Sequence, residues 1–171
     1  SESVRGEMPA SDRSSSQNRD SLNGKILRVR PNGEPARGNP SGSRVYSMGH
    51  RNVLGLEFDA EGRLWASEMG PEGGDELNLI QPGLNYGWPA ASMGVHYGGA
   101  DIPDHAEGDG FEPPKAWWGP ETAPGSLMIY DGDLFPAWTG DAFLGALAGQ
   151  KLIRVDLDGE TPRIASRLLR S

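Results

Sequence analysis

Short stretches of alternating apolar and polar residues, each followed by a turn signal, constrain the fold of this chain more than any other feature. Residues 53–58 and 63–67 flank a polar turn at residues 59–62, a pattern typical of a β-hairpin. The other strand-like stretches are residues 25–29, 126–130, 142–147 and 151–155. With 25 Gly and 14 Pro in 171 residues, the composition favours strands joined by turns over a helical bundle. We therefore expect an all-β fold.

One internal match indicates how the strands are grouped. Residues 25–34 (KILRVRPNGE) match residues 151–160 (KLIRVDLDGE) at an interval of 126 residues, which is three times 42. A four-stranded propeller blade takes about 40–45 residues. A single match does not establish a period, because strand–turn sequences also repeat by chance, but it favours a β-propeller. At this length per blade, the chain would hold about three to four blades.

The bulk composition argues against several classes of protein. The net charge of −8 disfavours a nucleic-acid partner, which would require clustered Lys and Arg. No apolar stretch is long enough to span a bilayer. Because the sequence contains no Cys, it can form neither disulfides nor thiolate metal sites.

The chain divides into an N-terminal arm and a strand-rich remainder. Residues 1–21 are polar and carry a run of serines, so we expect an arm or a loop. Residues 22–171 are expected to form the partial propeller. Within them, residues 89–125 are irregular and contain several Pro and Trp residues, and a loop of this length is uncommon unless it is functional.

Three motifs follow one another closely: GHRN at residues 49–52, SEMGPEGGDELN at residues 67–78 and NYGWP at residues 85–89. In this order they resemble the soluble quinoprotein sugar dehydrogenases, the glucose/sorbosone dehydrogenase family. A weaker resemblance extends from about residue 22 to about residue 158. The resemblance implies a six-bladed β-propeller, of which this chain covers about half of the ring, or about three blades.

The resemblance also implies a function. Family members oxidise an aldose at its anomeric carbon to a lactone and transfer hydride to pyrroloquinoline quinone, with calcium beside the cofactor. The expected partners are then an aldose substrate and an external electron acceptor, and the expected location is the periplasm or the cell exterior. Two other functions stay open: a non-catalytic propeller that binds a protein or a glycan, and a calcium-dependent lactonase on the same kind of scaffold.

Oxygen donors gather in the second motif. The carbonyl groups of Gly70 and Pro71 precede two carboxylates, those of Asp75 and Glu76. Such donors, without a soft ligand, suit calcium, although taken alone they are at least as typical of an acidic surface turn. The resemblance implies that Gly70 and Pro71 bind the calcium that holds the quinone, and that Asp75 contacts the cofactor. It assigns Glu76 and Tyr86 to a second, structural calcium.

A cation and an amide lie just before the strand-like stretch that begins at residue 53. Arg51 offers a planar fork for carboxylate oxygens, and Asn52 adds a donor and an acceptor. Taken alone, Arg51 would be an ordinary partner in a surface ion pair. The resemblance makes both residues contacts of the quinone, which carries three carboxylates. Trp118 is either a stacking partner of the cofactor or a core residue.

Two positions depart from the family pattern. Met69 stands at a cofactor-binding position where members usually have Gln or His, and its thioether is only a weak acceptor. Ala148 stands where a Lys that contacts the cofactor is common. We therefore expect weakened quinone binding, unless the nearby Lys151 supplies the missing cation.

No catalytic residue is assigned. His50 is expected to be a hydrogen-bonded structural residue, and His96 and His105 are expected to be exposed in the long loop. The family's catalytic histidine belongs to a region upstream of the matched motifs. The 171 residues alone are therefore expected to be inactive.

Overall fold

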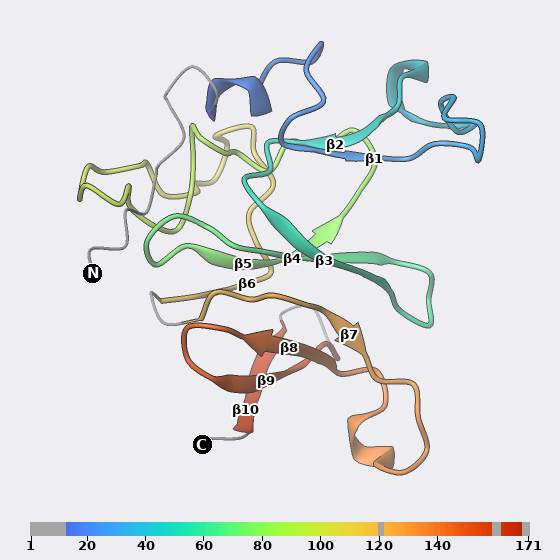
Figure 1. Ribbon diagram of the computed structural model, residues 1–171, viewed down its shortest axis with the longest axis vertical. Helices are drawn as coiled ribbons and strands as arrows, with labels where there is room; N and C mark the ends of the chain where they lie inside the picture. Colours follow the sequence, from blue (N-terminus) through green and yellow to red (C-terminus); the bar gives the residue numbers. More distant parts are fainter. Residues whose placement is uncertain (1–12, 120–121, 159–161, 169–171) are drawn as a thin grey trace.

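The computed structural model describes residues 13–119, 122–158 and 162–168, and most of their regular structure is β-strand (Figure 1). The strands are β1 (Lys25–Leu27), β2 (Val45–Met48), β3 (Val53–Phe58), β4 (Leu64–Glu68), β5 (Asp75–Ile80), β6 (Ala116–Trp118), β7 (Met128–Ile129), β8 (Ala142–Ala146), β9 (Lys151–Asp156) and β10 (Arg163–Leu168). Within the described residues, three short 3-10 helices accompany them: η1 (Ser14–Ser16), η2 (Pro40–Gly42) and η3 (Pro136–Trp138). The expected all-β fold is confirmed.

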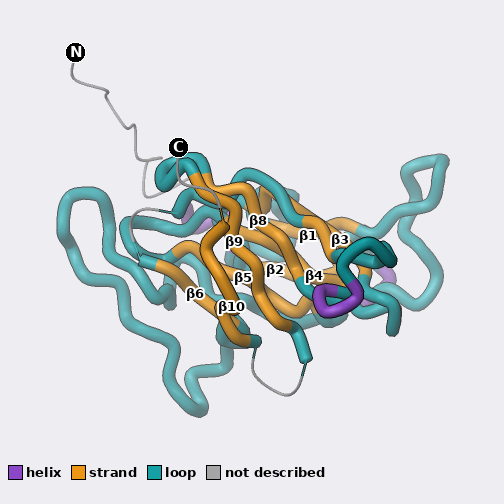
Figure 2. Tube along the Cα trace, turned by 90° about the horizontal axis from the view of Figure 1, so that it is seen from below, coloured by secondary structure: helices purple, strands orange, loops and turns teal. Residues whose placement is uncertain are grey.

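The strands form three antiparallel sheets that lie one above another in Figure 1. β3, β4, β5 and β6 pair in that order to form the middle sheet, and β7 to β10 form the next sheet in the same way. β1 and β2 form a smaller sheet. Seen from below, strands of successive sheets overlap while long loops project beyond them (Figure 2). Each four-stranded sheet is a meander of consecutive strands, which is the construction of a propeller blade.

The two central strands of the middle sheet, β4 and β5, are buried on both faces. One hydrophobic cluster lies between this sheet and the β7–β10 sheet, and it includes Leu77, Leu144 and Ile153. A second cluster, which includes Ile26 and Ala66, lies between the middle sheet and the small β1–β2 sheet. Burial of apolar area contributes roughly 25 cal/mol per Å² to the free energy of folding. The sheets are therefore held face to face, as propeller blades are.

The hairpin expected from the sequence is confirmed, since β3 pairs with β4 across the turn at residues 59–62. Asp59 closes the turn by accepting the backbone N–H of Arg63 at 2.8 Å through its carboxylate. Four strands have no clear sequence signal: β2, β5, β6 and β10. β6 lies inside the segment expected to be an irregular loop, residues 89–125. It forms a strand there because its backbone pairs with the first half of β5. The connection from β5 to β6 is therefore residues 81–115.

The internal sequence match does not mark blades of 42 residues. Lys25 begins β1 and Lys151 begins β9, and the whole β3–β6 sheet lies between their two sheets along the chain. The interval of 126 residues therefore covers two steps from sheet to sheet rather than three. Each step exceeds 42 residues on average, mainly because the β5–β6 connection is long.

The segment around η1 packs against the NYGWP motif. Ser16 is buried, and its hydroxyl donates to the carbonyl of Trp88 at 2.6 Å. The side-chain amide of Gln17 donates to the same carbonyl at 2.6 Å and to Asn85 Oδ1 at 3.1 Å. The described part of the expected polar arm is thus attached to the strand-rich region. Residues 1–12 lie outside the described residues.

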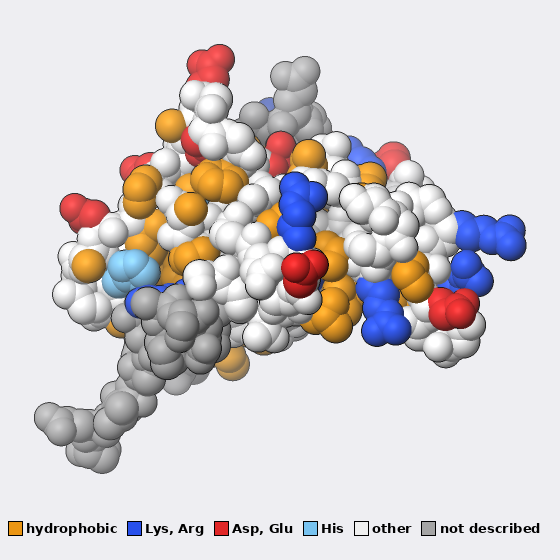
Figure 3. Space-filling model, turned by 90° about the horizontal axis from the view of Figure 1, so that it is seen from above, with side chains coloured by type: hydrophobic (Ala, Val, Ile, Leu, Met, Phe, Trp, Pro, Cys, Tyr) orange, Lys and Arg blue, Asp and Glu red, His pale blue; other side chains and the backbone are white. Residues whose placement is uncertain are grey.

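The face above β1 and β2 has a mixed surface. Acidic and basic side chains are interspersed on it, with hydrophobic side chains between them (Figure 3). In the part of the chain that the structure describes, no helix combines the length and apolar character needed to cross a bilayer.

Candidate functional site

Three chain segments meet at one end of the middle sheet. Asn52 precedes β3, Met69 follows β4 and Asp75 begins β5. Because neighbouring strands are antiparallel, the start of β3, the end of β4 and the start of β5 lie at the same end of the sheet. A pocket of about 420 Å³ opens there. Its lining residues are Arg51, Asn52, Met69, Gly70, Pro71, Glu72, Gly73, Asp75, Tyr97, Ala123 and Ala148.

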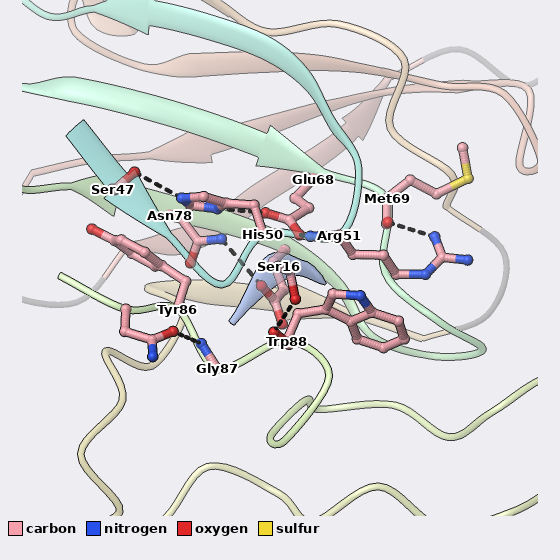
Figure 4. A network of polar contacts seen from close by, with 12 residues as sticks. Ser16, Ser47, His50, Arg51, Glu68, Met69, Asn78, Tyr86, Gly87 and Trp88 are labelled. Carbon is pink, nitrogen blue, oxygen red and sulfur yellow. Dashed lines mark hydrogen bonds and ion pairs between the residues drawn. The ribbon is translucent and has the colours of Figure 1, made fainter. Parts of the chain in front are cut away.

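Arg51 is a partly buried cation on the wall of this pocket. Its Nη1 donates to the carbonyl of Met69 at 2.8 Å (Figure 4), and its Nη2 lies 3.4 Å from the hydroxyl of Tyr97. The guanidinium carbon lies 5.4 Å from the centroid of the Trp88 ring and 5.5 Å from that of Tyr97. No carboxylate of the described residues forms an ion pair with Arg51. The guanidinium therefore keeps donors available for an anionic ligand.

A buried network fixes the backbone of Arg51 (Figure 4). His50 Nε2 lies 2.8 Å from Ser47 Oγ, and His50 Nδ1 lies 3.0 Å from Glu68 Oε2. The other carboxylate oxygen of Glu68 accepts the backbone N–H of Arg51. The order Ser47–His50–Glu68 has the connectivity of a catalytic triad. Ser47 is only 1% exposed and His50 only 2%, however, so this network is structural, as expected for His50.

Asp75 links two loops at the edge of the pocket. One carboxylate oxygen accepts the backbone N–H of Gly70 at 3.0 Å, and the other accepts that of Ala123 at 2.7 Å. Burial raises the pKa of Asp75 above its ordinary value, while the two N–H donors and the charge of Arg51 lower it in part. Since its oxygens already hold both loops, Asp75 shapes the pocket wall.

The turn that carries the expected calcium ligands is compact. The carbonyl of Pro71 accepts the N–H of Gly74 at 3.1 Å, which leaves its second lone pair for another partner. A Cβ at Gly70 would lie only 1.7 Å from the carbonyl oxygen of Gly74. Only glycine therefore allows the chain to fold back on itself at this position. Both carbonyl-bearing residues line the pocket beside Asp75.

Glu76 lies outside the pocket, in the interior of the blade. Its carboxylate is buried and accepts a hydrogen bond from Asn78 Nδ2 at 3.1 Å. Burial is the main cause that raises the pKa of Glu76 to about 8, and the nearby carboxylate of Glu68 adds to it. The side-chain oxygen of Asn78 is buried and has no hydrogen-bond partner among the described residues.

Tyr86 and Trp118 do not line the pocket either. Tyr86 stacks on His50 with ring centroids 4.7 Å apart, and its hydroxyl donates to the carbonyl of Leu79 at 2.6 Å. Burial raises the pKa of that hydroxyl. Trp118 is 4% exposed and belongs to the core between the sheets, whereas Trp117 on the other face of β6 is 51% exposed. Strand alternation thus directs Trp118 into the core.

The two loop histidines differ in environment. His96 Nδ1 lies 3.2 Å from Arg13 Nη1, and its ring meets Trp88 edge to face at 6.2 Å. His105 was expected to be exposed, but its side chain is only 4% exposed, because its loop folds back over Gly87. Burial lowers the pKa of His105. Neither histidine lines the pocket.

The pocket also contains residues that the motifs do not indicate. Tyr97 comes from the β5–β6 connection. Ala123 is held at the pocket by its backbone N–H, which donates to the carboxylate of Asp75. A backbone donor leaves no signal in a sequence. Met69 and Ala148 do line the pocket, whereas Lys151 does not. Within the described residues, no group of three or more His, Asp or Glu side chains is arranged to hold a metal ion.

Comparison with known proteins identifies the family. The model of the glucose/sorbosone dehydrogenase family matches residues 5–171. The chain belongs to this family. The aldose sugar dehydrogenase of Escherichia coli is 37% identical over 167 residues, which cover 92% of this chain and 45% of the relative. The quinoprotein glucose dehydrogenase B of Acinetobacter calcoaceticus is 49% identical over 70 residues, which cover 39% of this chain and 15% of the relative.

Solved structures agree with this assignment. The apo form of the soluble E. coli aldose sugar dehydrogenase superposes with a TM-score of 0.83 at 36% identity, over 92% of this chain and 48% of that one. The pyrroloquinoline-quinone-bound form of the aldose sugar dehydrogenase of Streptomyces coelicolor superposes with a TM-score of 0.71 at 42% identity. This match covers 88% of this chain and 41% of that one. The expected propeller fold is confirmed, and this chain spans about half the length of these relatives.

Proposed function

We propose that the full-length protein is a calcium- and pyrroloquinoline-quinone-dependent aldose dehydrogenase. Its reaction would convert an aldose to the lactone by oxidation at the anomeric carbon. The proposal rests mainly on the position of Arg51. Its guanidinium is partly buried, lines the pocket and forms no ion pair with a carboxylate of the described residues. A planar fork of N–H donors suits a carboxylate-bearing cofactor.

The residues of the pocket fit such a cofactor in part. Asn52 is exposed at the pocket beside Arg51, so its side-chain amide can donate to a second oxygen of the ligand. Met69 and Ala148 line the same pocket and offer no strong polar contact. We therefore expect Arg51 and Asn52 to supply the main charged and polar contacts on this part of the wall.

The donor set also suits calcium, which prefers oxygen ligands. Gly70 and Pro71 would hold the ion at the pocket through their carbonyl groups, and the Pro71 carbonyl has one lone pair in use. A second ion would lie near Glu76 and Tyr86. There the buried carboxylate with its raised pKa favours a cation, as does the Asn78 oxygen, which accepts no hydrogen bond from the described residues.

When bound, the quinone would supply the acceptor for hydride, and calcium would polarise it. The residues of this chain contribute binding and orientation. Arg51 and Asn52 hold the cofactor, Asp75 ties the loops that border it, and the buried His50–Glu68 pair fixes the backbone of Arg51. The general base would come from the upstream part of the protein. Electrons would then pass to an external acceptor, in the periplasm or outside the cell.

One observation favours a second candidate, a propeller that binds a protein or a glycan without catalysis. Ala148 places no cation on the pocket wall, and Met69 adds a thioether instead of an amide or imidazole. A calcium-dependent lactonase would likewise need the metal without the quinone.

Dye reduction by the full-length protein separates these functions. We expect reduction with glucose only when both calcium and pyrroloquinoline quinone are present, and no reduction with the methyl glycoside, whose anomeric hydroxyl is blocked. Lactone hydrolysis without quinone would support the lactonase instead. Absence of both activities, together with absence of quinone binding, would favour the non-catalytic propeller.

A further inference from the structure

The guanidinium of Arg51 lies against two aromatic rings from different parts of the chain. Both ring centroids, those of Trp88 and Tyr97, are within the roughly 6 Å at which a cation is attracted to a π-face. The contact of Arg51 Nη2 with the Tyr97 hydroxyl is 3.4 Å, which is long for a hydrogen bond. The ring of Tyr97, more than its hydroxyl, therefore holds the cation.

The two rings are anchored independently. Trp88 is 5% exposed, its backbone N–H donates to the carbonyl of Gly49 at 3.0 Å, and its backbone carbonyl accepts from the Ser16 hydroxyl. It therefore belongs to the packed body of the protein. Tyr97 belongs to the β5–β6 connection, so its position depends on how that connection is attached.

The β5–β6 connection is attached to the turn at residues 70–74. Glu72 and Val95 exchange two backbone hydrogen bonds, at 3.0 and 2.9 Å. Next to this bridge the two backbones touch, because a Cβ at Gly94 would lie 2.5 Å from the N atom of Gly74. Tyr97 follows only two residues after Val95. The connection is thus fixed to the pocket wall, and it presents the Tyr97 ring to Arg51.

A long Arg side chain loses rotamer freedom when a ligand orders it, at a cost of up to about 2 kcal/mol. Rings that hold the guanidinium before the ligand arrives remove part of that cost. We propose that Tyr97 is a positioning residue, whose ring holds Arg51 in the orientation that receives a carboxylate of the bound cofactor. This inference rests on the proposed function.

Titration of the full-length, calcium-loaded protein with pyrroloquinoline quinone tests the inference. Two variants remove the ring, Tyr97→Leu and Tyr97→Gln, so that a folding defect in one leaves the other to decide. We expect both to bind the quinone about three- to thirtyfold more weakly, the range of a cation–π contact. Tyr97→Phe, which keeps the ring, should bind within about twofold of the wild type, because only a weak hydrogen bond is lost.

Phe111→Leu is the matched control, because Phe111 lies in the same connection but packs on His105, with ring centroids 6.5 Å apart. It should bind quinone like the wild type. At saturating quinone, both ring-free variants should regain wild-type kcat and keep the wild-type KM for the sugar, which a general distortion of the site would not allow. Wild-type affinity in both ring-free variants would overturn the inference alone. Failure of the wild type to bind quinone would overturn the proposed function and this inference with it.

Discussion

Asp75 Oδ2 accepts the backbone N–H of Ala123 at 2.7 Å, although the two residues are 48 positions apart in the sequence. Its other carboxylate oxygen accepts the N–H of Gly70 at 3.0 Å. One buried side chain thus joins the turn after β4 to the segment that leads into β7. The carboxylate of Asp75 therefore holds together two parts of the pocket wall that are far apart in the sequence.

Replacing that carboxylate should destabilise the protein. In Asp75→Asn, one of the two acceptors becomes an N–H₂ group that faces a backbone N–H. A buried donor left without a partner costs about 1–3 kcal/mol. Denaturant unfolding of the full-length protein should therefore show a lower free energy of unfolding. Asp101→Asn, at an exposed position of the β5–β6 connection, is the control. Equal stability of the two variants would contradict the role of Asp75 as a link between loops.

Restoring the polar residues of the family should tighten quinone binding. The double variant Met69→Gln, Ala148→Lys adds an amide and a cation to the pocket wall. A single charge-assisted hydrogen bond contributes about 1.5–3 kcal/mol, which is more than tenfold in affinity. Leu147→Lys is the control for added charge, because Leu147 is 68% exposed and does not line the pocket. Equal affinity of the double variant and the wild type would show that the pocket compensates elsewhere.

Calcium should stabilise the folded protein. A ligand that binds only the native state adds about 2.7 kcal/mol at a concentration of 100 times its dissociation constant. The melting temperature of the full-length protein should therefore rise with calcium and fall with a chelator. Magnesium, which requires near-ideal octahedral geometry, should have a smaller effect. Indifference of the melting temperature to both calcium and chelator would remove the metal from the proposed function.

The calcium-free protein should lose stability as the pH rises. Burial and the Glu68 carboxylate raise the pKa of Glu76 from 4.5 to about 8, so the native state holds a proton that the unfolded chain releases in this interval. The free energy of unfolding in the presence of a chelator should therefore decline from about pH 5 to about pH 8. Unfolding curves at several pH values measure this decline.

The variant Glu76→Gln should flatten this pH dependence, because the amide does not titrate. Glu107→Gln, at an exposed position, should leave the dependence unchanged. Calcium should also reduce it in the wild type, since a bound cation would balance the charge of the carboxylate. A slope that is the same in Glu76→Gln and in the wild type would assign the pH dependence to other groups.

The sequence predicts the part of the site that lies next to strands in the chain. Arg51, Met69 and Asp75 come together because each flanks a strand of one meander, and hairpin order alone sets their proximity. Ala123 and Tyr97 were not predictable in this way. They reach the pocket through a backbone hydrogen bond and through a long connection, and neither leaves a local pattern.

The sequence motifs also did not predict which side chains point into the core. Trp117 and Trp118 are adjacent in the sequence, and only the register of β6 on β5 decides which of them enters the core. The side chain of His105 is buried where its loop folds over Gly87, and sequence spacing does not encode this contact between distant segments. The short strands and turns of the sequence predicted the fold class. They did not predict the length of a blade, because the connection between β5 and β6 is unusually long.

The most direct test of the account is quinone binding to Arg51 variants of the full-length protein with calcium present. Arg51→Ala removes the guanidinium from the pocket wall, so we expect the dissociation constant to rise more than tenfold, as for a lost charge-assisted hydrogen bond. Arg51→Lys should recover only part of the affinity, because an ammonium group lacks the planar fork. Arg37→Ala, at an exposed position away from the pocket, should bind like the wild type. Equal dissociation constants for Arg51→Ala and the wild type would contradict the assignment of this pocket to the cofactor.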